Sequence, residues 1–230
     1  YARNKILEYH KIDYETIVIN HGIADNFRIN KKNKNNLSNE KEIILTYVSN
    51  ADLYKHNWNV LEAVYNIRNK YGLNVQLQLI GSNDGNSKAL NKINLAQEKF
   101  DLKNTFVIRT SKISHGLLVS YLEKSDIFIF ASTCENMPNT LIEGMSTGLP
   151  IVCSSYGPMP EVIQDGAVFF DPENVNSIEN ALYLMISDDE LRLKCARRSY
   201  EISKDFSWNK CSNQTFKFLS NKIKNEIKYK

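Results

Sequence analysis

Residues 127–145 read IFIFASTCENMPNTLIEGM. The first five form an unbroken apolar run, as expected for a strand that is buried on both faces. A polar loop follows to Met137, and Pro138 then precedes a segment of helical period at Asn139–Thr147. A buried strand, a polar loop and a helix in this order predict a parallel sheet covered by helices on both faces.

The same alternation extends along most of the chain. Strands are predicted at Ile17–Asn20, Ile43–Ser49, Val75–Gly81, Phe106–Arg109, Ile127–Ala131, Ile151–Ser154 and Ala167–Asp171. Helices are predicted at Trp58–Tyr71, Ser87–Phe100, Ser114–Lys124, Asn139–Thr147, Val175–Ser187, Glu190–Lys204 and Trp208–Lys228. The fold class is therefore α/β, with a helical C-terminal tail.

Two segments interrupt this order. Tyr1–Lys11 has the pattern of an amphipathic helix that belongs structurally to something before it. Asn26–Lys41 is dominated by Asn and Lys, which predicts an exposed linker or loop. Because the first residue is not Met, upstream sequence is expected.

The composition is that of an ordinary globular domain. Lys and Arg number 29 against 26 Asp and Glu, and a net charge of +3 gives no reason to expect a nucleic-acid groove. No apolar run approaches a membrane span, and the charged start of the sequence gives no reason to expect a signal peptide. The cysteines are scattered without metal-binding spacing, which is typical of free thiols in a reducing cytoplasm; they are Cys134, Cys153, Cys195 and Cys211.

The loop after Ala131 has the residues of an anion-binding site. Ligands of open α/β sheets bind beyond the carboxyl ends of the strands, where Glu135 is expected. The backbone N–H groups of Asn139, Thr140 and Leu141 would be free at the helix start and suited to a diphosphate. Glu143, about one and a half turns into the helix, could accept hydrogen bonds from vicinal hydroxyls. The alternative is that Glu135 is a capping acid and Glu143 a solvated helix residue.

Several motifs together resemble a known family. Glu135 and Glu143 enclose seven residues, which is similar to the E-x7-E motif of retaining GT-B glycosyltransferases of family 4, also called glycosyltransferase group 1. Further similarities run in the family's order: VINHGI at 18–23, GLPIV at 148–152, GPMPEVI at 157–163 and FSW at 206–208. The sequence ENMPNT at 135–140 is most similar to that of bacterial surface-polysaccharide transferases. The resemblance implies the C-terminal, Rossmann-like half of a GT-B fold.

The resemblance also implies roles for the acidic residues. Glu143 would bind the ribose hydroxyls of a nucleotide, and Glu135 would contact the donor sugar near its reacting carbon. The N–H groups after Met137 would hold the diphosphate, whose developing charge must be stabilised. The chain contains no D-x-D sequence, so a donor site without metal or other cofactor is expected. UDP is favoured over GDP.

Other residues are placed in the donor site by the same resemblance. Lys55 is the expected cation of the diphosphate, although a solvated loop lysine is the alternative. Asn50 stands where the family often has an arginine. Ser111 and Lys112 fall at the nucleobase pocket. Gly81 would either let the backbone approach the ligand or form a plain βα turn. Structural roles are expected for His21, His115 and Cys134, the last as a small buried side chain.

The resemblance divides the chain into three parts. Residues 1–16 would end a missing N-terminal domain and include the hinge, 17–205 would bind the nucleotide-sugar, and 206–230 would form a crossover helix. A glycan or lipid-linked acceptor would bind through the missing domain. The enzyme would be cytoplasmic, at the inner face of the inner membrane, with peripheral membrane contact and self-association through the last helix. Two alternatives are a donor-binding subunit of a two-polypeptide enzyme and a non-catalytic nucleotide-binding module.

Overall fold

The computed structural model describes residues 1–12, 15–29, 37 and 41–228, with side chains described to residue 224. Over these residues, six parallel strands form one sheet in the order β3-β2-β1-β4-β5-β6. The strands are β1 (Ile43–Val48), β2 (Val75–Ile80), β3 (Val107–Thr110), β4 (Ile127–Phe130), β5 (Ile151–Ser154) and β6 (Val168–Phe170). The predicted α/β class is confirmed.

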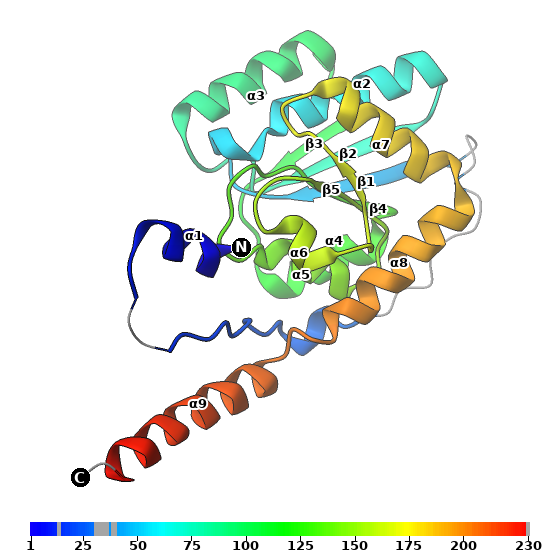
Figure 1. Cartoon of the computed structure of the whole chain (residues 1–230). Helices are drawn as coiled ribbons and strands as arrows, with labels where there is room; N and C mark the ends of the chain where they lie inside the picture. The colour runs from blue at the N-terminus through cyan, green and yellow to red at the C-terminus, as the bar shows by residue number, and fades with distance from the viewer. Residues whose placement is uncertain (13–14, 30–36, 38–40, 229–230) are drawn as a thin grey trace.

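Helices cover both faces of the sheet (Figure 1). One layer contains α2 (Asn57–Tyr71), α3 (Ser87–Phe100) and α7 (Val175–Ser187), with α2 packed against the other two. The opposite layer contains α4 (His115–Lys124), α5 (Asn139–Ser146), α6 (Met159–Ile163) and α8 (Asp189–Ser203), with α5 packed against α8. Because both faces are covered, central strands are fully buried: β4 and β5 have no exposed residue.

The strand order locates the functional edge of the sheet. The chain moves outward from β1 to β2 and β3, then returns to the other side of β1 with β4. The helices that follow β1 and β4, α2 and α5, lie on opposite faces. This reversal opens a crevice beyond the carboxyl ends of β1 and β4, where α/β proteins of this kind bind ligands.

Two predictions about the first 41 residues need correction. Ile17–Asn20 is not a strand of the sheet: Ile17 and Val18 are exposed and lie beside the last helix, α9 (Trp208–Lys228). An extended segment becomes a strand only where a sheet edge can take its hydrogen bonds. The expected loop 26–41 falls largely outside the described residues. Its described start lies in the 3-10 helix η1 (Asp25–Phe27), whose Phe27 is buried.

Other differences are local. Residues 159–163, for which no helix was predicted, form α6, with a proline in its first turn. The predicted helix 1–11 is observed as α1 (Ala2–Tyr9), which has no buried residue. Pro138 is the N-cap of α5 and precedes its first turn.

Candidate functional site

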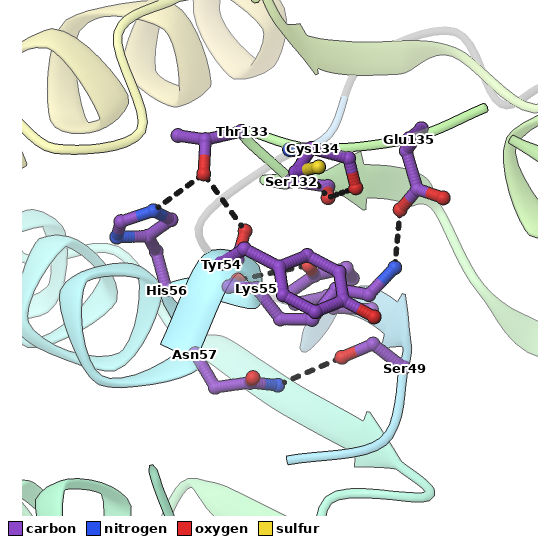
Figure 2. A network of polar contacts seen from close by, with 10 residues as sticks. Ser49, Tyr54, Lys55, His56, Asn57, Ser132, Thr133, Cys134 and Glu135 are labelled. Atoms are coloured by element: carbon purple, nitrogen blue, oxygen red, sulfur yellow. Dashed lines mark hydrogen bonds and ion pairs between the residues drawn. The ribbon is translucent and has the colours of Figure 1, made fainter. Parts of the chain in front are cut away.

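The loops after β1 and β4 meet at the reversal of strand order. Lys55 ends the 3-10 helix η2 (Leu53–Lys55) in the first loop, and Glu135 lies in the second. The Lys55 Nζ donates a hydrogen bond to Glu135 Oε1 and forms an ion pair with it (Figure 2). Only 10% of the Lys55 side chain and 15% of the Glu135 side chain is exposed. The structure thus joins two predicted site residues that lie 80 positions apart, and the solvated-lysine alternative is wrong.

Aromatic rings surround the ammonium group. Lys55 Nζ lies 5.0 Å from the centre of the Tyr54 ring and 5.5 Å from that of Phe130. Cation–π contact at these distances stabilises a positive charge that has lost most of its water. The Tyr47 hydroxyl donates to the Lys55 carbonyl at 2.8 Å, which holds the backbone of the lysine from below. The site therefore contains a fixed, largely desolvated cation.

The start of α5 provides two unoccupied N–H donors. The N–H group of Asn139, expected to be free, donates to the Met137 carbonyl at 2.9 Å. Within the described part of the chain, the N–H groups of Thr140 and Leu141 have no acceptor. The helix start is still suited to an anion, with two donors in place of the three expected.

Glu143 is buried within α5. It is 8% exposed, so the solvated alternative does not hold. Helix α5 packs directly on β4 because the next residue is a glycine: a Cβ added to Gly144 would lie 2.7 Å from the Phe128 ring. Burial raises the pKa of the Glu143 carboxyl from 4.5 to about 7. A carboxylate with so perturbed a pKa inside a crevice is typical of a functional site.

A pocket of about 530 Å³ opens in front of Glu143. It is lined by five of the predicted site residues, namely Asn50, Lys112, Asn139, Thr140 and Glu143. It is also lined by Val48, Ser49, Ile80, Gly81, Asp84, Ile113, His115 and Leu118. The pocket combines apolar and polar lining residues, and its volume is sufficient for a small organic ligand.

The remaining predicted residues lie outside this lining. Lys55 and Glu135 form the ion pair beside it, and Leu141 is buried in the core. Ser111 is exposed and does not line the pocket, whereas its neighbour Lys112 does. Met137 borders a separate pocket of about 160 Å³, together with residues of α1.

Sequence reasoning missed Asp84 and underrated His115. The Asp84 carboxylate accepts a hydrogen bond of 2.7 Å from the Lys112 N–H, so it joins the loops after β2 and β3 at the pocket. Both residues come soon after strand ends, and that position could have indicated them. Cys134, expected to be buried, is exposed. Within the described residues, no cluster of His, Cys, Asp or Glu side chains could hold a metal ion.

Comparison with known families identifies the class of protein. The family described as "Glycosyl transferases group 1" matches residues 28–202. This match covers more than half of the chain, and the chain therefore belongs to the group 1 glycosyl transferases. The resemblance of the sequence motifs is confirmed at the level of the family.

Individual proteins resemble this chain in sequence or in fold. The chain is 34% identical over 88 residues to O-antigen chain mannosyltransferase B of Escherichia coli. The matched segment covers 38% of this chain and 23% of that protein. A glycosyltransferase structure from Rickettsia africae superposes with a TM-score of 0.81 at 19% identity, over 97% of this chain and 62% of that one. The structure of Anabaena HepE, solved with UDP and glucose, superposes with a TM-score of 0.69 at 16% identity. The match covers 78% of this chain and 48% of that one. The chain spans less than two thirds of each.

Proposed function

We propose that this chain is the donor-binding half of a retaining, metal-independent glycosyltransferase that uses a nucleoside-diphosphate sugar. The observation that carries the proposal is the pocket of about 530 Å³ with buried Glu143 on its wall, beside the Lys55–Glu135 ion pair. A nucleotide-sugar needs an acceptor for ribose hydroxyls, donors for a diphosphate and a polar contact for the sugar. Groups of these three kinds come together at this edge of the sheet.

Each group has a specific part in the proposal. Glu143 accepts hydrogen bonds from the ribose hydroxyls, and the free N–H groups of Thr140 and Leu141 bind the diphosphate. Lys55 contacts the diphosphate and stabilises the charge that develops as it leaves. Glu135 then faces the sugar near its reacting carbon. Lys112 lines the pocket and would lie at its nucleobase end. Ser111 lies outside the lining and would contribute to that end only from outside it.

We further propose a UDP-sugar donor and a role in building a bacterial surface polysaccharide. Support for UDP is the fold shared with Anabaena HepE, which was solved with UDP and glucose. Support for the pathway is the identity shared with O-antigen chain mannosyltransferase B of Escherichia coli. The acceptor would be a glycan or a lipid-linked glycan.

The complete enzyme would contain a preceding acceptor-binding domain. In this proposal residues 1–16 are its end and the hinge, 17–205 bind the donor, and 206–230 cross back to it. The chain's coverage of its relatives, below two thirds, supports this division. The enzyme would work in the cytoplasm at the inner face of the inner membrane. A separate acceptor subunit is the second candidate, and a non-catalytic nucleotide-binding module is the third.

Calorimetric titration of the 230-residue chain with UDP and GDP in EDTA tests the donor site. We expect UDP to bind without divalent metal and more tightly than GDP. Glu143→Ala should weaken UDP binding by about 1–3 kcal/mol, because a buried acceptor of hydroxyl hydrogen bonds is lost.

The matched control is Glu123→Ala, which removes an exposed glutamate from α4. It should leave UDP affinity unchanged. No binding of either nucleotide at millimolar concentration would contradict the donor-site proposal. Equal affinities of the Glu143→Ala and Glu123→Ala variants for UDP would contradict the role of Glu143.

A further inference from the structure

Thr133 connects the two loops that carry the ion pair. Its N–H donates to the Tyr54 carbonyl at 2.9 Å, and its hydroxyl lies 3.4 Å from the same carbonyl. The hydroxyl also lies 3.2 Å from Nε2 of His56 (Figure 2). Tyr54 and His56 flank Lys55, and Thr133 lies two positions before Glu135. The contacts of Thr133 therefore tie the loop after β4 to both neighbours of the lysine.

His56 has an unusual backbone conformation for a residue with a side chain. Its φ of 50° and ψ of 31° fall in the left-handed region, which glycine adopts without strain. The residue nevertheless has a buried imidazole, tilted against the Trp58 ring at 5.5 Å. Backbone strain of this kind persists where surrounding contacts over-determine it, and such positions concentrate at functional sites.

The proton positions can be assigned from the partners. Thr133 has one hydroxyl proton, and the Tyr54 carbonyl can only accept, so the hydroxyl donates to Tyr54. The Thr133 oxygen then accepts from a protonated Nε2 of His56. Burial lowers the pKa of His56, which favours a neutral ring at neutral pH, and the contact with Thr133 then requires the tautomer with its proton on Nε2. The chain of donors runs from His56 through Thr133 to Tyr54.

We propose that Thr133 and His56 are positioning residues, which hold Lys55 and Glu135 in register for the donor diphosphate and sugar. This inference rests on the proposed function. Neither residue lines the pocket, and in this inference both act on the ligand only through Lys55 and Glu135. The ammonium group sits at the end of a long flexible side chain, and two fixed neighbours restrict where it can reach. Groups held in place before the ligand binds need no reorganisation when charge develops.

Substitutions at the two ends of the His56–Thr133 bond test the proposal. Thr133→Val keeps the shape and the backbone N–H but removes the hydroxyl, whereas Thr133→Ser keeps the hydroxyl. His56→Gly keeps the left-handed backbone and removes the ring. Two readouts are needed: UDP affinity by calorimetry, and the Lys55 ammonium signal by nitrogen-15 NMR without nucleotide, assigned by its loss in Lys55→Arg.

We expect Thr133→Val and His56→Gly each to shift the Lys55 signal and to weaken UDP binding about five- to tenfold. Thr133→Ser should restore both within about twofold. Because both residues act through one bond, the double variant should lose no more affinity than the worse single one. Thr215→Val is the control, since its hydroxyl bonds the Cys211 carbonyl within α9. It should change neither readout.

Unchanged Lys55 signals in Thr133→Val and His56→Gly would overturn the proposal, as would fully additive losses of UDP affinity in the double variant. A different result would contradict the proposed function, namely a wild-type chain that binds no nucleotide. In that case the NMR signal would still report on the positioning of Lys55. Should Thr133→Val unfold, His56→Gly provides the same two readouts on its own.

Discussion

Glu143 shows how one side chain can be both a proposed site residue and a source of instability in the fold. The carboxyl is buried against the core by the close packing of α5 on β4, which raises its pKa to about 7. Hydroxyl groups of a ligand donate to the ionised carboxylate, so a bound ribose would recover part of the lost hydration. Without ligand, no side chain in the described part of the chain forms an ion pair with the ionised carboxylate.

This leads to a prediction about stability and pH. The folded-state pKa is raised above the ordinary value of 4.5, so the folded chain holds the Glu143 proton more tightly than the unfolded chain. The stability that this provides is fully present below pH 4.5 and is lost as pH rises to 7. Relative to Glu143→Gln, the wild type should lose about 2–3 kcal/mol of unfolding free energy between pH 4.5 and 7.5. Urea unfolding of both proteins at the two pH values measures this.

The comparison is internally controlled, because every other titrating group is shared by the two proteins. A difference between wild type and Glu143→Gln that stays constant over this pH range would show that Glu143 ionises normally. In that case the carboxyl would have access to water that the packing of α5 does not indicate.

At the scale of elements, the turn between a helix and the next strand determines where that strand begins. The turn from α3 into β3 is built around Asp101. Its carboxylate accepts from the N–H groups of Thr105, Phe106 and Val107 at 2.7, 3.1 and 2.8 Å, and from the Thr105 hydroxyl at 2.8 Å. Burial acts to raise the pKa of Asp101, but these hydrogen bonds outweigh it and lower the pKa. The register of β3, and thus the position of Lys112 beyond its end, depends on this turn.

Replacing the carboxylate should therefore destabilise the fold strongly. Asp101→Ala leaves buried N–H groups without an acceptor, and we expect a loss of about 3 kcal/mol in the free energy of unfolding. Equilibrium urea denaturation at pH 7 is the measurement. Asp25→Ala removes a carboxylate whose side chain is 99% exposed, and it should change stability by less than about 0.5 kcal/mol. Similar values for the two variants would show that the turn does not hold β3.

The molecule as a whole consists of the layered sheet and an extended C-terminal arm (Figure 1). Residues 15–21 lie beside the start and middle of α9, through the Glu15–Lys222 ion pair at 2.7 Å and the stacking of His21 on Trp208. Large apolar side chains of α9 remain exposed at Trp208, Phe216, Leu219 and Ile223. The described helices include none with the length and apolar character of a membrane span. Self-association through α9 stays a prediction.

The last prediction concerns the activity of the 230-residue chain on its own. We expect the 230-residue chain to bind UDP but to transfer no sugar, because the proposal assigns the acceptor site to a preceding domain. Proximity and orientation of the acceptor can contribute about 7–11 kcal/mol to lowering a barrier. The assay supplies UDP-sugars and lipid-linked glycan acceptors to the chain, with and without the upstream domain added in trans. Transfer by the chain alone at the rate of the complete enzyme would contradict the division of the active site.

The sequence by itself determined the class of the fold and the order of its elements. A strand buried on both faces must be a continuous apolar run, and a surface helix must carry an apolar stripe, so β4, α7 and most other elements were predictable within a residue or two. The local unit from Ala131 to Glu143 was predictable for the same reason. Its strand, loop and helix lie close together in sequence, and residues near in sequence constrain each other directly.

Tertiary structure alone decided which strands are neighbours and what their loops bring together. No local pattern places β4 beside β1, because strand adjacency depends on how all the helices pack on both faces at once. The pairing of Lys55 with Glu135 and the place of Asp84 in the pocket follow from that packing. The same reason explains the error at Ile17–Asn20: its apolar residues suit a strand, but a strand also needs a free sheet edge within reach.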